Sequence, residues 1–109
     1  MTDETWQAVG VASDFSVGDI CAADLGGREV IVCRTEAGFA VLERRCLHAG
    51  ADLAEGLIVG ADIICPLHGW CYRADTGVHV QSAVNRLASF AVRVTPEGVI
   101  LARTQPRTP

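Results

Sequence analysis

The sequence predicts an all-β fold, a small antiparallel barrel or sandwich. Short segments rich in β-branched residues alternate with turn signals at short intervals. No window of a dozen residues shows the 3.6-residue apolar period of an amphipathic helix. Half of the 109 residues are apolar, which is enough to bury one core but not two. We therefore expect one domain over residues 1–103, followed by a loose C-terminal tail over residues 104–109.

The expected strands are bounded by residues that favour turns. In chain order, the strands span residues 6–11, 20–24, 28–35, 39–44, 63–65, 71–73, 78–80, 87–94 and 99–103. The breaks between them carry Gly, Pro, Asp, Ser or Thr, at Ser13-Asp14, Gly18-Asp19, Gly26-Gly27, Glu36 to Gly38, Pro66 to Gly69, Asp75 to Gly77 and Thr95 to Gly98. The Gly26-Gly27 pair predicts a tight hairpin. Residues 49–57 are expected to form at most a short helical turn.

The bulk composition argues against several classes of partner. A formal net charge of −4 gives no basic footprint, so nucleic acid is not expected as a partner. The apolar runs are far too short to cross a membrane. The N-terminus lacks the positive and apolar regions of a signal peptide, so we expect a cytoplasmic protein. In that reducing compartment, metal binding or redox chemistry is favoured over disulfides for the five cysteines, and their odd number agrees.

Two segments break the strand pattern and share a composition. Cys46 and His48 form a C-x-H pair, and Cys65 and His68 follow after sixteen intervening residues as C-x-x-H. Each pair lies just after a predicted strand, so two loops could present one Cys and one His each at the same end of the fold. Zinc accepts such a ligand set, although usually from separate Cys pairs and His pairs. Loops that each mix both ligand types suit two neighbouring irons better, with two Cys on one iron and two His on the other.

Residues 46–77 resemble the cluster-binding segment of Rieske [2Fe-2S] proteins. The stretch CPLHGWCYRADTG, from Cys65 to Gly77, is similar to the second cluster loop of small Rieske ferredoxins that serve aromatic-ring-hydroxylating oxygenases. The flanking strands fit such a ferredoxin, so the resemblance covers nearly the whole chain. It implies a small antiparallel barrel with a cluster-binding subdomain over about residues 45–77. It also implies one Rieske-type [2Fe-2S] cluster, with four ligands, Cys46, His48, Cys65 and His68.

The resemblance implies a soluble one-electron carrier. Such a protein accepts electrons from a flavin-dependent NAD(P)H reductase and hands them to a terminal oxygenase, without itself catalysing a bond change. Three alternatives remain: the Rieske domain of an oxygenase, a small subunit like that of NADH-dependent nitrite reductases, and a structural zinc module. A complete oxygenase would need a mononuclear iron held by two His and a carboxylate, and only His79 remains beyond the ligand pair. The presence of all four ligands argues against the nitrite reductase subunit, which often lacks them.

Charge explains why the ligand types matter. Two ferric ions, two sulfides and two thiolates sum to zero when both imidazoles are neutral, whereas four thiolates give a charge of −2. Adding an electron to a neutral centre costs less, so His ligation raises the potential from about −400 mV to about −150 to +300 mV. The resemblance implies that the reduction potential of this protein lies in the lower part of that range. The disulfide cysteines of respiratory Rieske proteins are replaced by Ala51, or a close neighbour, and by Leu67, and their Ser is replaced by Trp70. Tyr72, however, matches a Tyr that donates to a cysteine sulfur.

The other candidate side chains are given structural interpretations. Packing as small hydrophobes is expected for three cysteines, Cys21, Cys33 and Cys71. His79 lies between two valines and is expected to face solvent. For Trp70, shielding of the metal centre and packing under the second loop both stay open. Solvated surface is expected for most charges beside the first loop, Arg44, Arg45, Asp52 and Glu55.

Overall fold

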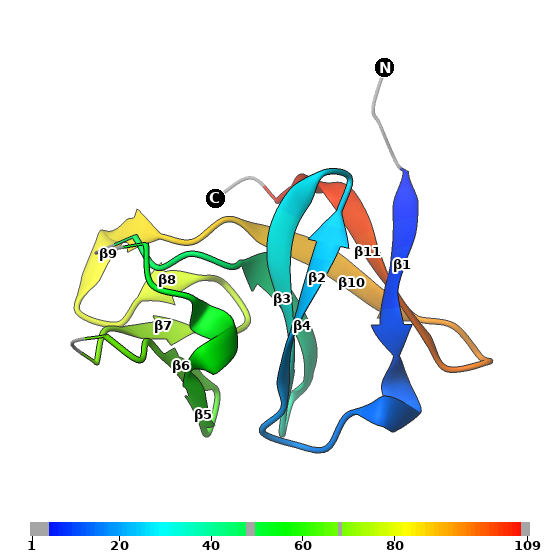
Figure 1. Ribbon diagram of the computed structural model, residues 1–109, viewed down its shortest axis with the longest axis horizontal. Helices are drawn as coiled ribbons and strands as arrows, with labels where there is room; N and C mark the ends of the chain where they lie inside the picture. The colour runs from blue at the N-terminus through cyan, green and yellow to red at the C-terminus, as the bar shows by residue number, and fades with distance from the viewer. Residues whose placement is uncertain (1–4, 48–49, 68, 108–109) are drawn as a thin grey trace.

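The computed structural model describes residues 5–47, 50–67 and 69–107, which form two antiparallel sheets (Figure 1). The elements are β1 (Trp6–Val11), η1 (Ala12–Asp14), β2 (Ile20–Leu25), β3 (Arg28–Thr35), β4 (Gly38–Glu43), η2 (Leu53–Glu55), β5 (Leu57–Val59), β6 (Asp62–Ile64), β7 (Cys71–Arg73), β8 (Val78–His79), β9 (Ser82–Arg86), β10 (Ser89–Val94) and β11 (Val99–Pro106). Within the described ranges, no helix is long and apolar enough to cross a membrane. The predicted all-β fold is confirmed.

Six strands in the order β1-β11-β10-β4-β3-β2 form a nearly closed barrel. The side chain of Gln7 bridges the two edge strands. Its Nε2 donates to the carbonyl of Asp24 at 2.8 Å, and its Oε1 accepts from the N–H of Gly26 at 2.8 Å. The side-chain amide of Gln7 therefore pairs with a backbone carbonyl and a backbone N–H at the β2–β3 hairpin. In a fully closed barrel, hydrogen bonds between the two edge strands would pair such groups. The Gly26-Gly27 hairpin itself forms as predicted.

The second sheet is an insertion in the barrel. Its strand order is β5-β6-β7-β8-β9, and all five strands come from the chain between β4 and β10. In Figure 1 this sheet occupies one end of the molecule, beside the barrel. The insertion is tied where it leaves and returns, because the N–H of Glu43 donates to Ala88 O at 2.9 Å and the N–H of Ala88 donates to Glu43 Oε1 at 2.6 Å. The barrel thus acts as a base that fixes both ends of the inserted subdomain.

The described residues form two core clusters, so the expectation of one core but not two is wrong, and strands β3 and β4 contribute to both. Val30 and Val32 point into the barrel, whereas Ile31 and Cys33 on the opposite face pack under the inserted sheet. All four side chains are fully buried, as expected for a strand covered on both faces. Burial stabilises each large aliphatic side chain by roughly 1.5–3 kcal/mol, so this shared wall contributes to both cores.

The predicted strands are observed with small shifts at their ends, and two further strands were missed. β5 and β9 are short elements whose partners lie in the same insertion, so tertiary pairing decides them more than composition does. The short helical turn expected within residues 49–57 is η2. The tail expected from Thr104 begins later, because β11 continues to Pro106 between its two neighbours. Thr104 N–H donates to Thr5 O at 3.0 Å, and Pro106 pairs with Phe90.

Gly77 is predicted to be intolerant of a side chain. It has a φ of +78°, and a Cβ would lie 2.4 Å from the carbonyl oxygen of Leu87. We expect Gly77→Ala to lower the free energy of unfolding in urea by the left-handed penalty of about 1–2 kcal/mol plus about 1–3 kcal/mol for overpacking. Gly60→Ala is the matched control, since Gly60 has a φ of +61° with nothing within 4 Å of a Cβ. Equal losses in the two variants would contradict this account.

Candidate metal centre

The first loop leaves the barrel after β4 and is closed on itself by backbone hydrogen bonds. The N–H of Cys46 donates to the carbonyl of Ala51 at 2.9 Å, and the N–H of Gly50 donates to the carbonyl of Cys46 at 2.9 Å. Gly50 has a φ of +67°, a left-handed conformation that glycine adopts at little cost. These bonds fix the backbone from which the Cys46 side chain projects.

An ion pair between Arg44 and Asp52 joins the two ends of this loop. Arg44 Nε donates to Asp52 Oδ1 at 2.8 Å, and Nη2 donates to Oδ2 at 2.7 Å. Asp52 also caps η2 by accepting from the N–H of Ala54 at 2.9 Å. The expectation that these two charges are merely solvated surface is wrong. Closure of the loop places them opposite each other and leaves only 17% of the Asp52 side chain exposed.

The second loop follows β6 and also closes on its own backbone. The N–H of Cys65 donates to the carbonyl of Trp70 at 2.7 Å. The N–H of Leu67 donates to Cys65 Sγ at 3.4 Å, so the loop directs one of its own donors at the sulfur. Gly69 allows the reversal with a φ of +68°. The turn predicted between Pro66 and Gly69 is thus observed in its described part.

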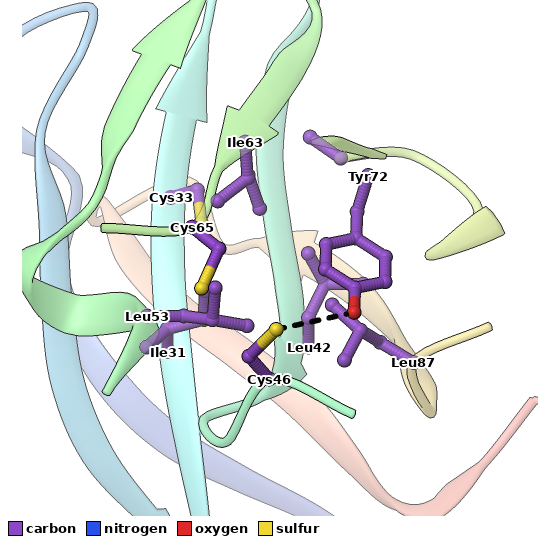
Figure 2. Close-up of a cluster of buried hydrophobic side chains, with 10 residues drawn as sticks. Ile31, Cys33, Leu42, Cys46, Leu53, Ile63, Cys65, Tyr72 and Leu87 are labelled. Carbon is purple, nitrogen blue, oxygen red and sulfur yellow. Dashed lines mark hydrogen bonds between the residues drawn. The ribbon is translucent and has the colours of Figure 1, made fainter. Parts of the chain in front are cut away.

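The structure brings Cys46 and Cys65 together from the two loops. Both residues are 2% exposed and belong to the core under the inserted sheet, with Leu53 and Ile63. Figure 2 shows the two sulfurs facing the same space. Burial raises the pKa of the Cys65 thiol, and the neighbouring Cys46 raises it further, although the Leu67 N–H acts in the opposite direction. The other two predicted ligands, His48 and His68, lie outside the described residues.

Tyr72 supplies a hydroxyl to the first sulfur. It is fully buried on β7, and its hydroxyl lies 3.3 Å from Cys46 Sγ (Figure 2). The same oxygen accepts a hydrogen bond from the N–H of Leu47 at 3.3 Å. The hydroxyl proton is therefore free to point at the sulfur. Burial raises the pKa of Tyr72, with the nearby Cys46 adding to the effect, so Tyr72 remains a protonated donor.

An aromatic cluster of Trp70, Tyr72 and His79 packs beneath the second loop. The His79 ring lies 4.5 Å from the Trp70 ring and 5.4 Å from the Tyr72 ring, both in edge-on arrangements. His79 is only 8% exposed, so the prediction that it faces solvent is wrong. Pairing of β7 with β8 places His79 opposite Tyr72 and turns it inwards. Its Nδ1 accepts from the N–H of Gln81 at 3.1 Å. For Trp70, packing under the loop is the interpretation that the structure supports.

The remaining cysteines differ in their surroundings. Cys33 is fully buried as predicted, and desolvation raises its pKa to about 12. Cys21 is exposed, so its predicted packing role is wrong; it lies on β2, an edge strand of the barrel. Cys71 is partly buried, and burial together with Asp62 raises its pKa. None of the five cysteines forms a disulfide.

The donor arrangement fits metal-bound thiolates. Two sulfurs lie together, away from water, and each has a hydrogen-bond donor nearby, Tyr72 O–H for Cys46 and Leu67 N–H for Cys65. A neutral thiol accepts hydrogen bonds only weakly, whereas a thiolate on a soft metal accepts them well. Such donors tune the metal as well as orient its ligands. Among the described residues, no group of three or more His, Cys, Asp or Glu side chains could hold a metal ion, so this fit rests on the two sulfurs.

Comparison with known sequences identifies related domains in longer proteins. Residues 5–91 match the Rieske [2Fe-2S] domain family. The chain is 37% identical over 71 residues, 64% of its length, to the probable 3-ketosteroid-9-alpha-monooxygenase oxygenase component of Rhodococcus rhodochrous. It is 29% identical over 93 residues, 84% of its length, to apoptosis-inducing factor 3 of Homo sapiens. The chain spans only 18% and 15% of the lengths of these curated relatives.

Several solved structures share the whole fold. A chain from a complex of reduced oxygenase and oxidised ferredoxin in carbazole 1,9a-dioxygenase has a TM-score of 0.86 and 30% identity, covering 97% of this chain and 99% of its own. The ferredoxin of carbazole 1,9a-dioxygenase from Nocardioides aromaticivorans IC177 has a TM-score of 0.84 and 27% identity, covering 93% and 99%. A putative NADH-dependent nitrite reductase small subunit from Mycobacterium tuberculosis has a TM-score of 0.84 at 19% identity, covering 96% of each chain, which shows a shared fold alone.

The Arg44–Asp52 pair predicts a pH-dependent contribution to stability. Hydrogen bonding to Arg44 lowers the pKa of Asp52 from 3.8 to about 2. Because the folded-state pKa lies below the unfolded value, the pair stabilises the fold fully above about pH 4 and loses this effect as the pH falls toward about 2. We expect Asp52→Asn, which keeps a capping side chain, to lower the free energy of unfolding by on the order of 1 kcal/mol at neutral pH.

The difference in unfolding free energy between the native protein and Asp52→Asn, measured in urea at each pH, should shrink as the pH falls through that window. Acid effects on other groups cancel in this difference. Glu55→Gln removes the same charge from an exposed neighbour and serves as the control. A difference that stays constant from neutral to acidic pH would contradict the assignment of the pair.

Proposed function

This chain belongs to the Rieske [2Fe-2S] domain family, and we propose that it is a ferredoxin delivering single electrons to a ring-hydroxylating oxygenase. Its cofactor is a Rieske-type [2Fe-2S] cluster, and the chain is a Rieske-fold electron carrier. The electron donor would be a flavin-dependent NAD(P)H reductase, and the acceptor would be the terminal oxygenase. The observation that carries the proposal is the buried pair of Cys46 and Cys65, brought together from two loops with a donor beside each sulfur.

We propose four ligands, Cys46 and Cys65 on one iron and His48 and His68 on the other. The geometry of the two cysteines supports their part of this assignment, and the C-x-H and C-x-x-H pattern supports the histidines. When bound, the cluster would take up and release one electron at a time at a potential raised by its imidazole ligands. The buried surroundings of the two sulfurs exclude water on the barrel side.

Tyr72 and the loop backbone would stabilise the negative charge that arrives on reduction. The Tyr72 hydroxyl and the Leu67 N–H each direct a proton at a sulfur. Hydrogen bonds to sulfur favour the reduced, more negative state and so raise the potential. No disulfide joins the two loops, and the resemblance accordingly implies a potential in the lower part of the Rieske range.

Exposed apolar side chains on both loops support docking of a partner at this end. Leu47 is 46% exposed and directly follows Cys46, and Leu67 is 41% exposed and lies two residues after Cys65. Large apolar side chains exposed next to a functional site are typical of interaction surfaces. The full-length likeness to chains of carbazole 1,9a-dioxygenase supports an oxygenase as that partner. The five cysteines form no disulfide, which agrees with the cytoplasmic location that we propose with the function.

Two other functions would use the same fold. The nitrite reductase small subunit shares the architecture at 19% identity, and likeness at that level supports the fold alone. The match to oxygenase components spans only 18% of their length, so the chain could act as the Rieske module of a larger redox assembly. The identity of the electron acceptor distinguishes both alternatives from a ferredoxin.

Reconstituted electron transfer tests the proposal directly. The holoprotein is mixed with a flavin-dependent NAD(P)H reductase and a terminal oxygenase, and substrate hydroxylation is measured with each component omitted in turn. If the chain is the ferredoxin, its omission abolishes turnover, and its visible spectrum alternates between those of the reduced and oxidised forms. Reduction by the reductase without reoxidation by any oxygenase, but with reoxidation by a nitrite reductase, would move the assignment to that alternative.

The cluster assignment predicts a defined metal and sulfide content. We expect two irons and two acid-labile sulfides per chain, with a visible spectrum that bleaches on reduction. Cys46→Ser and Cys65→Ser should each abolish the colour and the labile sulfide, because each removes a thiolate ligand. Cys21→Ser is the matched control, since Cys21 is exposed and lies on β2. One zinc per chain without sulfide would refute the cluster and favour the zinc module.

Removal of the Tyr72 hydroxyl should lower the reduction potential. Tyr72→Phe keeps the ring in the core and deletes only the donor to Cys46 Sγ. With about 1 kcal/mol per hydrogen bond and about 59 mV per tenfold change in a one-electron couple, we expect a fall on the order of 40 mV in voltammetry. The unfolding transition of the variant serves as the control for packing. A shift to more positive potentials would contradict the role given to Tyr72.

A further inference from the structure

A cavity of about 370 Å³ lies where the inserted subdomain meets the barrel, away from the two ligand cysteines. The inserted subdomain contributes Thr76, in the turn before β8, and Arg86, at the end of β9. The barrel contributes Glu43 of β4, Ser89 of β10 and Arg107, which follows β11. The two parts of the fold therefore share the walls of one cavity, and the predicted redox site uses none of these residues.

Arg86, one of the residues that line this cavity, has a hydrogen-bond donor without an acceptor. Its Nε is buried from solvent and has no hydrogen-bond partner in the described part of the chain. A buried donor without an acceptor is costly, and more so when it belongs to a charged group. Such groups are rare in folded proteins, and an acceptor that the protein itself does not provide, such as a water or an ion, is one explanation for them.

The cavity wall carries more positive than negative charge. Arg107 donates through Nη1 to the backbone carbonyl of Asp75 at 3.1 Å, which leaves its charge uncompensated. Neither Arg86 nor Arg107 forms an ion pair among the residues that the structure describes. Glu43 is the acidic residue of the wall, and its Oε1 already accepts from the N–H of Ala88 at 2.6 Å. The wall thus holds two guanidinium groups and one carboxylate that already accepts a hydrogen bond.

A hydroxyl in the wall adds a donor to this arrangement. Thr76 Oγ1 accepts from the N–H of Val78 at 3.3 Å, so its proton remains free to donate. Guanidinium groups with their planar N–H forks, together with hydroxyls, are the groups that recognise carboxylate and phosphate oxygens.

We propose that this cavity binds a small oxyanion, such as phosphate or a carboxylate, through Arg86 and Arg107. The anion would accept hydrogen bonds from the terminal nitrogens of the two guanidinium groups and balance the excess positive charge of the wall. Because its binding groups come from both the barrel and the inserted subdomain, the anion would also hold these parts together. A ligand that binds only the folded state raises stability with its concentration, so binding and thermal stability should change together.

Calorimetric titration of the holoprotein with inorganic phosphate, and separately with acetate, at ionic strength fixed by chloride, tests this site. We expect saturable binding at one site and a rise in the unfolding temperature with the bound anion. Arg86→Gln and Arg107→Gln should each weaken binding by about tenfold or more, as expected for loss of a charge-assisted hydrogen bond. Glu43→Gln should tighten binding, because it removes the repelling charge while keeping an oxygen that can accept from Ala88. The phosphate and acetate arms show which oxyanion the cavity prefers.

Arg93→Gln is the matched control, since Arg93 is an exposed arginine on β10 that packs over Trp6 and does not line the cavity. It removes the same charge and should leave anion binding almost unchanged. If Arg86→Gln fails to fold, the opposite shifts expected for Arg107→Gln and Glu43→Gln still decide the question. The proposal is overturned if neither anion binds, or if the cavity variants and Arg93→Gln weaken binding equally.

Discussion

Two cysteine sulfurs lie buried between two loops, and the fold around them has to satisfy both. A sulfur that carries negative charge away from water needs hydrogen-bond donors, and the fold supplies them from Tyr72 on β7 and from the Leu67 backbone. Tyr72 reaches Cys46 from β7 of the inserted sheet, whereas Leu67 donates to the sulfur of Cys65, two residues earlier in the same loop. The inserted sheet and the second loop therefore each bring one donor to the sulfurs.

The barrel makes this arrangement possible by acting as a base with two usable faces. The alternating side chains of β3 and β4 fill the barrel on one face and the space under the sulfurs on the other. Without the second apolar face of β3 and β4, the inserted sheet would have no apolar surface to pack against. The short strands of that sheet bury too little apolar surface on their own. The mutual hydrogen bonds of Glu43 and Ala88 then fix both ends of the insertion.

Non-covalent contacts hold each loop in place of a disulfide. The Arg44–Asp52 pair closes the base of the first loop, and Asp52 also caps η2, so one carboxylate orders both segments. Beneath the second loop, Trp70 and His79 pack edge-on, and the backbone of Gln81 fixes the His79 ring. These contacts lie at the bases of the loops and leave Leu47 and Leu67 exposed at their surface.

Features that depend on neighbours along the chain could be predicted from the sequence. The β-branched runs and their glycine and proline breaks predicted most strands, and the spacing of Cys46, His48, Cys65 and His68 predicted a ligand set, of which the structure describes the two cysteines. Features that depend on residues distant in sequence emerge only when the chain folds. His79 was expected at the surface by its alternation with valines, yet pairing with Tyr72 turns it inwards. The Arg44–Asp52 pair and the cavity lined by Arg86 and Arg107 also depend on the folded chain. An ion pair or a cavity wall forms only when separate segments are brought together.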